Sequence, residues 1–351
     1  MKSFSPEFIE NQPISQGLLR TIRLLGEFKG RQELFQRQAP QALETLRQVA
    51  VIQSTESSNR IEGITALPKR IEALVARIAV PRNRPEQEIA GYRDVLNTVH
   101  TNYTHMRLTA GLVKQLHRDL LRYTASEGGN WKIASNDITE EWPDGTRFVR
   151  FEPVPPFAVS EYMEQLHTEF TLLWHSEQVE RLLLIPAYIL DFLCIHPFLD
   201  GNGRMARLLA LLLLYQAGYE VGKFVSLERI IEESKESYYD SLYASSQGWH
   251  EGKHSLRPWT EYFLGVVVAS YREFEERVGT LSTARGTKTK MVIDAVDRLP
   301  DGFRIAELER LCPGVTRDMI RVVLKQLRED GIVWCDGAGR NAVWRKRGNN
   351  S

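Results

Sequence analysis

The stretch HPFLDGNGR occupies residues 196–204, and a second arginine follows it at Arg207. An apolar helical run, residues 182–195, precedes the stretch, and another, residues 205–215, follows it. The pattern predicts a short loop that connects two buried helices and ends at the N-terminus of the second. Free backbone N–H groups and the helix dipole make such an N-terminus a natural binding site for anions. We therefore expect a mainly α-helical fold built around this loop.

The side chains of this loop supply what phosphate chemistry needs. His196 titrates near neutral pH and can act as a base, and Asp200 is a carboxylate of the kind that holds metal ions. Gly201 and Gly203 lack a Cβ, so the backbone can approach a ligand closely. The two arginines add charge that can clamp phosphate oxygens. The alternative is a buried loop whose histidine and aspartate have only structural roles.

The loop also resembles the signature of the Fic family, HPFx[D/E]GNGRxxR, and matches it at every defined position. The resemblance implies an all-helical core with a β-hairpin flap and the activity of a protein adenylyltransferase. Such an enzyme transfers AMP from ATP to a hydroxyl side chain (Tyr, Thr or Ser) of a protein. Both another protein and the enzyme itself are candidate targets. Magnesium is the cofactor that the resemblance implies.

The resemblance further implies a role for each residue of the loop. His196 would be the general base, and Asp200 would hold Mg²⁺. The phosphates of ATP would be bound by the amides of Gly201, Asn202 and Gly203 with the Asn202 side chain, by Arg204 at the α/β region and by Arg207 at the γ-phosphate. In the predicted helix 228–246 and just after it, Tyr239 or Trp249 would stack on adenine, although aromatic residues at helical spacing can equally belong to the core.

A polar run far upstream, residues 54–64, reads as a loop or a weakly capped helix start that ends at a glycine. Ser58 to Gly63 matches [S/T]xxxE[G/N], the inhibitory motif of many Fic proteins. The resemblance implies that Glu62 pairs with Arg207, which then cannot hold the γ-phosphate. A carboxylate on a guanidinium competes directly with phosphate for it. The alternative is a solvated glutamate at a helix end.

A β-hairpin is expected between the helical regions. Residues 126–133 are rich in glycine, and residues 147–151 alternate charged and apolar side chains as a strand does, with a turn at residues 142–145. In the Fic family a hairpin flap beside the active site pairs its backbone with the target segment. The insert at residues 135–146 is longer and more acidic than the compact family flap. A lid without target contact is the alternative.

The rest of the chain up to residue 280 is expected to be helical after an extended start, residues 1–13. Helical periodicity predicts helices over residues 18–34, 43–49, 67–78, 87–103, 109–121, 159–173, 228–246 and 258–279.

The C-terminal region follows a polar linker, residues 281–289, and predicts three helices and a hairpin, as in a winged helix-turn-helix. Arg317, Arg321 and Lys325 fall on one face of the third helix and could contact DNA. From residue 281 onward there are 14 Lys and Arg against 9 Asp and Glu, a net charge of +5. This charge is modest, so a protein-binding winged helix or a solvated face is the alternative.

Composition limits the class of protein. The 351 residues carry 45 basic and 45 acidic side chains, so no global field marks a nucleic-acid or membrane-surface protein. Cys194, Cys312 and Cys335 lie far apart, which argues against a zinc site or a disulfide framework and suits a cytoplasmic protein. We expect no membrane segment, because the apolar runs are broken or too short.

We therefore predict an N-terminal helical region (1–105), a Fic core (106–280) and a winged-helix domain (281–351). The predicted activity is AMP transfer, inhibited by Glu62. The alternatives are a DNA-binding regulator with a nucleotide-sensing Fic domain, and a Fic enzyme that transfers another phosphate-containing group or removes AMP. Because Fic proteins often dimerise, a homodimer is compatible with this reading.

Overall fold

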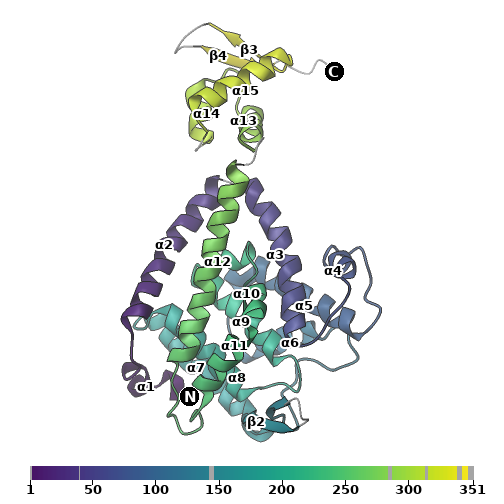
Figure 1. Cartoon of the computed structure of the whole chain (residues 1–351), viewed down its shortest axis with the longest axis vertical. Coiled ribbons are helices and arrows are strands. Elements are labelled where there is room, and N and C mark those ends of the chain that lie inside the picture. The colour runs from purple at the N-terminus through teal and green to yellow at the C-terminus, as the bar shows by residue number, and fades with distance from the viewer. Residues whose placement is uncertain are drawn as a thin grey trace. The chain divides into compact units, whose positions relative to one another are not determined.

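A computed structural model describes residues 2–38, 40–141, 146–283, 287–312, 315–337 and 342–346. The chain divides into two compact units, residues 1–32 with 45–274 and residues 33–44 with 275–351. Each unit has its own hydrophobic core, and each is mainly helical (Figure 1). None of the described helices is long and apolar enough to cross a membrane.

The helices of the first unit surround two that are almost entirely buried, α8 (Arg181–Ile195) and α9 (Asn202–Gln216), which pack against each other. Around this pair lie α1 (Pro6–Glu10), α2 (Gln16–Gln38), α3 (Pro40–Ile61), α4 (Pro68–Val75), α5 (Arg84–Asn102), α6 (Ala110–Leu120), α7 (Val159–Ser176), α10 (Leu227–Glu233), α11 (Lys235–Ser246) and α12 (Arg257–Thr283), of which α2, α3 and α12 extend beyond this unit. The apolar runs on both sides of the signature loop are thus the centre of the core, as the sequence predicts.

The predicted flap is present as two antiparallel strands, β1 (Ile138–Glu141) and β2 (Arg147–Phe151). Thr139 pairs with Val149 and Glu141 with Arg147, and the register shifts between Ile138 and Thr139. The predicted turn at residues 142–145 lies outside the described residues.

The second unit has the predicted winged-helix arrangement. It contains α13 (Thr287–Arg298), α14 (Ile305–Leu311), α15 (Arg317–Glu329), β3 (Val333–Asp336) and β4 (Val343–Lys346). The two strands pair antiparallel, and Phe303 adds a bridge to Trp344. The apolar face of α15 joins a core that includes Val292, Phe303 and Leu308. Most of the predicted hairpin tip, residues 337–341, lies outside the described residues.

The prediction that residues 1–13 are extended is wrong for the part that the structure describes. Lys2–Phe4 form a 3₁₀ turn, and α1 follows. Pro6 fits the first turn of α1, where no N–H partner is needed, and the Ser5 side chain caps it by accepting from the Phe8 amide at 3.3 Å.

The polar run 54–64 is also not a loop, since most of it forms the last turns of α3. Its Ser54 and Ser58 side chains are fully buried. Ser54 Oγ donates to Glu228 Oε2 at 2.7 Å, so buried partners replace the water that the polar sequence predicts. The expected stop is present, because α3 ends just before Gly63, whose φ is 78°.

The single helix predicted over residues 228–246 is divided at Ser234 into α10 and α11. Ser234 Oγ donates to the Ile230 carbonyl at 2.8 Å and lies 2.9 Å from the Tyr262 hydroxyl. These local bonds compete with continued helix, as serine side chains do at helix ends.

The contact between α5 and α6 provides a test of the packing. A Cβ added at Gly91 would lie 1.9 Å from the backbone carbonyl oxygen of Leu120. We expect Gly91→Ala to lower the free energy of unfolding by about 1–3 kcal/mol, because two helix backbones must separate. Urea unfolding measures this change.

Gly265→Ala in α12 is the matched control. No described atom lies within 4 Å of its added Cβ, so the substitution should raise the free energy of unfolding by about 0.5–1 kcal/mol. Equal stability of the Gly91→Ala variant and the wild type would contradict this description of the core.

Candidate active site

The signature loop turns sharply between α8 and α9. His196 ends α8 in the left-handed conformation, with φ 51°, and its N–H donates to the Phe192 carbonyl at 2.9 Å. Gly201 precedes α9 with φ 79°, a conformation that favours glycine. By the geometry of an α-helix, the first amides of α9 have no partner inside the helix. The loop therefore ends at the N-terminus of α9, as the sequence predicts, and anion binding there stays a prediction.

The side chain of Asn202 closes this loop. Its Oδ1 accepts from the Phe198 amide at 2.9 Å, and its Nδ2 donates to the Phe198 carbonyl at 2.7 Å. The amide nitrogen has a second N–H, and its assistance in phosphate binding stays a prediction. The Asn202 backbone N–H still lies in the first turn of α9.

His117 supports the loop from α6. Its ring stacks on Phe198 with centroids 3.6 Å apart, and its Nε2 lies 3.0 Å from the Asp200 carbonyl oxygen. The Gly129 amide donates to Nδ1 at 2.9 Å, so the proton is on Nε2 and is donated to that carbonyl. Burial lowers the pKa of His117 to about 4. Sequence reasoning missed this residue, because a single histidine in an amphipathic helix carries no distinctive signal.

The imidazole of His196 faces a cavity of about 500 Å³. Its Nδ1 lies 3.2 Å from the Leu193 carbonyl oxygen, which can only accept, so Nδ1 carries the proton. The lone pair on Nε2 is then available as a base. Burial lowers the pKa of His196 to about 4; the hydrogen bond to Leu193 opposes the shift and the charge of Lys132 adds to it.

The same cavity brings together several residues that the sequence predicted. Its lining includes Glu62, His196, Asp200, Gly201, Asn202, Gly203, Arg207 and Tyr239. The flap contributes Thr139 and Arg150, and α11 contributes Tyr238 and Tyr243. Trp249 does not line it; its indole N–H donates to Asp191 Oδ1 at 2.6 Å inside the core. The aromatic side chains of the wall are thus three tyrosines of α11 and Phe151 of the flap.

Arg207 is buried, with 4% of its side chain exposed, and its partners come from α3 and the residues just after it. Its Nε donates to Ser58 Oγ at 2.8 Å, and its Nη2 donates to the Ser58 carbonyl at 2.8 Å and to Glu62 Oε1 at 2.7 Å. Burial alone would lower the pKa of Arg207, but Glu62, Tyr238 and Tyr92 together outweigh burial, and the net pKa is raised. The motif residue Gly63 lies after α3 and does not line the cavity.

Gly203 allows the Glu62 carboxylate to come this close. A Cβ at Gly203 would lie 2.3 Å from Glu62 Oε1. The absence of a side chain at Gly203, which lets the backbone approach a ligand closely, therefore also makes room for the Glu62 carboxylate.

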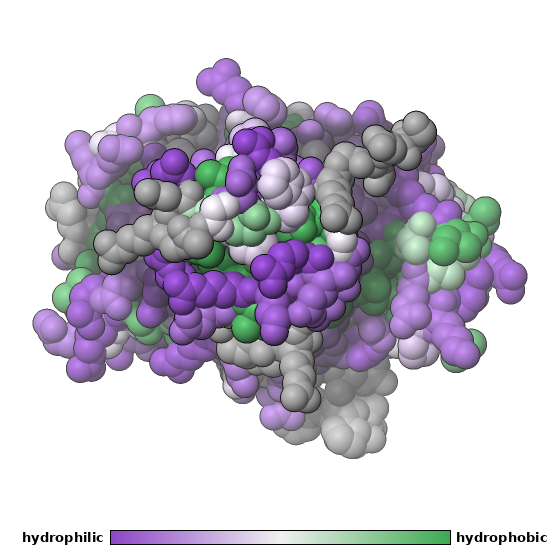
Figure 2. Space-filling model, turned by 90° about the horizontal axis from the view of Figure 1, so that it is seen from above, coloured by the Kyte–Doolittle hydropathy of each residue, from purple (hydrophilic) through white to green (hydrophobic). Residues whose placement is uncertain are grey.

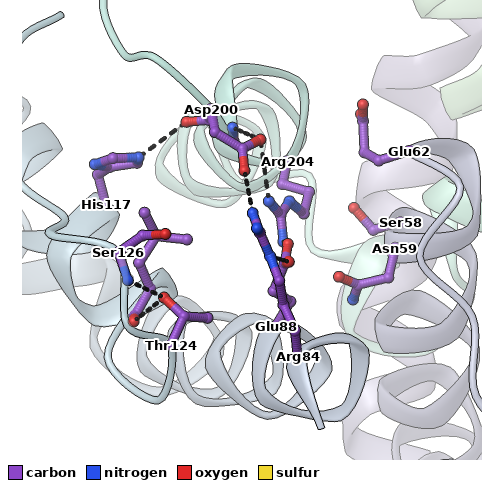
Figure 3. A network of polar contacts seen from close by, with 12 residues as sticks. Ser58, Asn59, Glu62, Arg84, Glu88, His117, Thr124, Ser126, Asp200 and Arg204 are labelled. Carbon is purple, nitrogen blue, oxygen red and sulfur yellow. Dashed lines mark hydrogen bonds and ion pairs between the residues drawn. The ribbon is translucent and has the colours of Figure 1, made fainter.

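Arg204 lies beneath the loop and is not among the residues that line the cavity. It is 1% exposed, and its Nη1 lies 2.7 Å from Glu88 Oε2 (Figure 3). Glu88 also accepts from Arg84 Nε at 2.9 Å. Both guanidinium groups approach the Asp200 carboxylate, each at 3.6 Å. This geometry differs from the predicted contact of Arg204 with the α- and β-phosphates.

The Asp200 carboxylate fits a magnesium ion that is held together with phosphate. Its side chain is 54% exposed at the cavity, and the Gly201 amide donates to its Oδ1 at 2.6 Å. The described residues contain no cluster of three or more His, Cys, Asp and Glu side chains that could hold a metal alone. Magnesium is commonly bound by one or two carboxylates plus substrate phosphates, which matches this arrangement.

The residues predicted to contact DNA lie exposed on α15, but each has an acidic neighbour. Arg317 Nη1 lies 3.2 Å from Glu309, Arg321 Nη1 lies 3.1 Å from Asp318, and Lys325 Nζ lies 3.9 Å from Glu329. The ridge on α15 is thus mixed in charge.

Hydrophilic residues make up most of the face of the molecule seen in Figure 2, with hydrophobic groups between them.

Comparisons with known proteins agree with this geometry. Residues 107–214 match the model of the Fic/DOC family. The chain is 27% identical over 236 residues to "Protein adenylyltransferase Fic" of Drosophila willistoni, a match that covers 64% of this chain and 42% of that protein. It is 33% identical over 139 residues to "Protein adenylyltransferase fic-1" of Caenorhabditis elegans, covering 38% and 23%. The matches thus span less than half of each relative.

Solved structures share the fold. A Fic family protein from Desulfovibrio desulfuricans G20 superposes with a TM-score of 0.63 at 20% identity and covers 97% of this chain and 98% of its own. A Fic domain containing signaling protein from Bacteroides thetaiotaomicron gives 0.61 at 20% identity, over 74% of this chain and 98% of its own. The mainly helical Fic fold with its flap is therefore shown.

The closure of the loop by Asn202 can be tested by stability. We expect Asn202→Ala to lower the free energy of unfolding by about 1–3 kcal/mol, because two hydrogen bonds are lost and the Phe198 amide loses its partner. The exposed Asn102→Ala at the end of α5 is the control and should change stability by less than about 0.5 kcal/mol. Equal effects of the two variants would contradict the role of Asn202.

Proposed function

We propose that this chain is a protein adenylyltransferase that transfers AMP from ATP to a hydroxyl side chain of a protein. One observation carries the proposal: a single cavity holds His196, Asp200, the start of α9 and Arg207. A base, a carboxylate and an anion site are therefore within reach of one nucleotide. The names of the related adenylyltransferases support the same activity.

In the proposed reaction, Nε2 of His196 accepts the proton of the target hydroxyl. The hydroxyl oxygen attacks the α-phosphorus of ATP, an O–P bond forms, and the bond to the oxygen that bridges the α- and β-phosphates breaks. The products are the AMP-modified side chain and pyrophosphate. The hydrogen bond from Nδ1 to the Leu193 carbonyl supports this role, because it fixes the tautomer and the ring orientation.

The start of α9 would bind the phosphates through the amides of Asn202 and Gly203, which lie where the helix dipole is positive. Asp200 would hold Mg²⁺, which offsets negative charge on the phosphates when it is bound. Arg204 would act on Asp200 rather than on ATP, since its guanidinium approaches that carboxylate from beneath the loop. Tyr239 in the cavity wall is the proposed stacking partner of adenine.

We further propose that Glu62 inhibits the enzyme by occupying Arg207. The guanidinium already has its Nε and Nη2 engaged by Ser58 and Glu62. A γ-phosphate would have to replace the Glu62 carboxylate, because both seek the same donor. With Arg207 occupied, ATP would bind without the contact that aligns its α-phosphate for transfer.

Radiolabelled ATP tests this function. Glu62→Gly should raise incorporation of AMP into protein by about tenfold or more, because the γ-phosphate gains a charge-assisted contact. His196→Ala on the Glu62→Gly background should abolish incorporation. Glu56→Gln serves as control, since Glu56 lies in the last turns of α3, just before Glu62, but pairs with Arg60. Undiminished incorporation by the double variant would show that His196 is not the base.

The pH dependence of transfer provides a second test. The neutral imidazole is the active form of a base, and the pKa of His196 is lowered to about 4. Transfer by the Glu62→Gly variant should therefore persist below pH 6.5 and decline only as the pH approaches 4. A decline centred near pH 6.5 would mean that His196 is not shielded as the structure describes.

A further inference from the structure

The backbone around His196 is held from outside by the segment that leads into the flap. The Lys132 amide donates to the Pro197 carbonyl at 2.8 Å, and the Asn136 Nδ2 donates to the Phe198 carbonyl at 2.7 Å. The Lys132 ammonium lies 3.4 Å from the Ile195 carbonyl and donates to Asn136 Oδ1 at 2.9 Å. Consecutive parts of the signature loop thus receive donors from one short segment.

Lys132 is 3% exposed, which is unusual for a lysine. Its partner Ile195 ends α8. The last carbonyl groups of a helix receive no N–H donor from within the helix, and the helix dipole favours a cation there. The buried ammonium therefore caps α8 immediately before His196. Burial lowers the pKa of Lys132 to about 8, and the charge of Asp137 opposes this shift.

His196 needs such support because its backbone conformation is unfavourable. A residue other than glycine with φ near 51° costs about 1–2 kcal/mol, so contacts from outside must hold it. The ring direction follows the backbone, and a misplacement of about 1 Å can reduce a rate by about 100-fold. The Lys132 ammonium acts on the carbonyl just before His196. The Lys132 amide and the Asn136 side chain act on the carbonyls of the two residues that follow His196.

We propose that Lys132 and Asn136 are positioning residues that hold His196 in its reactive orientation and link it to the flap. The inference rests on the proposed AMP transfer. Strand β1 begins at Ile138, two residues after Asn136. The same segment therefore sets both the direction of the base and the root of the hairpin that forms one wall of the cavity.

The effect of Lys132 on His196 is also electrostatic. The charged groups that act on the His196 ring are Lys132, which lowers its pKa, and Glu62, which raises it. Arg150 from the flap and Asp200 and Arg207 from the loop and α9 line the same cavity. Removal of the Lys132 charge should therefore move the His196 pKa upward.

The test uses the Glu62→Gly protein as parent. Lys132→Met keeps the aliphatic stem and removes the ammonium, and Asn136→Ala removes the second donor. Each should lower kcat by about 10- to 100-fold while the KM for ATP changes by less than about threefold. Lys132→Arg should restore most of the rate. The exposed Lys69→Met is the matched control and should leave the rate unchanged.

A second readout is independent of transfer. NMR titration of the His196 ring, assigned with His196→Ala, should give a higher pKa in Lys132→Met than in the parent. An unchanged His196 pKa would overturn the proposal. A loss of rate that is accompanied by a loss of thermal stability large enough to account for it would also overturn the proposal. If the Glu62→Gly parent transfers no AMP, the proposed function fails, and the ring titration still decides whether Lys132 positions His196.

Discussion

The site depends on how a buried positive charge is compensated. Arg207 lies on a central helix with 4% of its side chain exposed, so its guanidinium cannot rely on water. Ser58 and Glu62 supply the missing acceptors from another part of the chain. A guanidinium without these partners would be strongly destabilising, and any ligand that replaces Glu62 must itself bring negative charge. The polyphosphate of a nucleotide meets this requirement.

The same demand explains why the polar end of α3 is buried. Ser54 and Ser58 point into the core because Glu228 and Arg207 need partners there. Gly203 completes the arrangement, since a Cβ at this position would meet the Glu62 carboxylate. The loop, α3 and the start of α9 thus form one polar unit inside an otherwise apolar core. Lys132 and Asn136 hold the first part of the loop through the carbonyls of Pro197 and Phe198.

Much of this could be predicted from sequence, and the failures have physical causes. The apolar runs around the loop identify the central helices, and the fixed spacing of the signature identifies the cavity residues. The burial of Ser54 could not be predicted, because the residues that follow it in sequence are mostly polar and such a run is typical of a solvent-exposed segment. The closure of the loop by the Asn202 side chain could not be predicted, since spacing does not say which backbone groups an amide contacts. His117 and Lys132 gave no signal, because each acts through contacts with residues that are distant in sequence.

If Glu62 inhibits by occupying Arg207, Glu62 and the γ-phosphate of ATP compete for one guanidinium group. Calorimetric titration of the wild type and the Glu62→Gly variant with ATP and with ADP measures this competition. ADP lacks the γ-phosphate, so the account predicts that the variant gains affinity for ATP by about tenfold more than for ADP. An equal gain for both nucleotides, or no gain for ATP, would contradict the account.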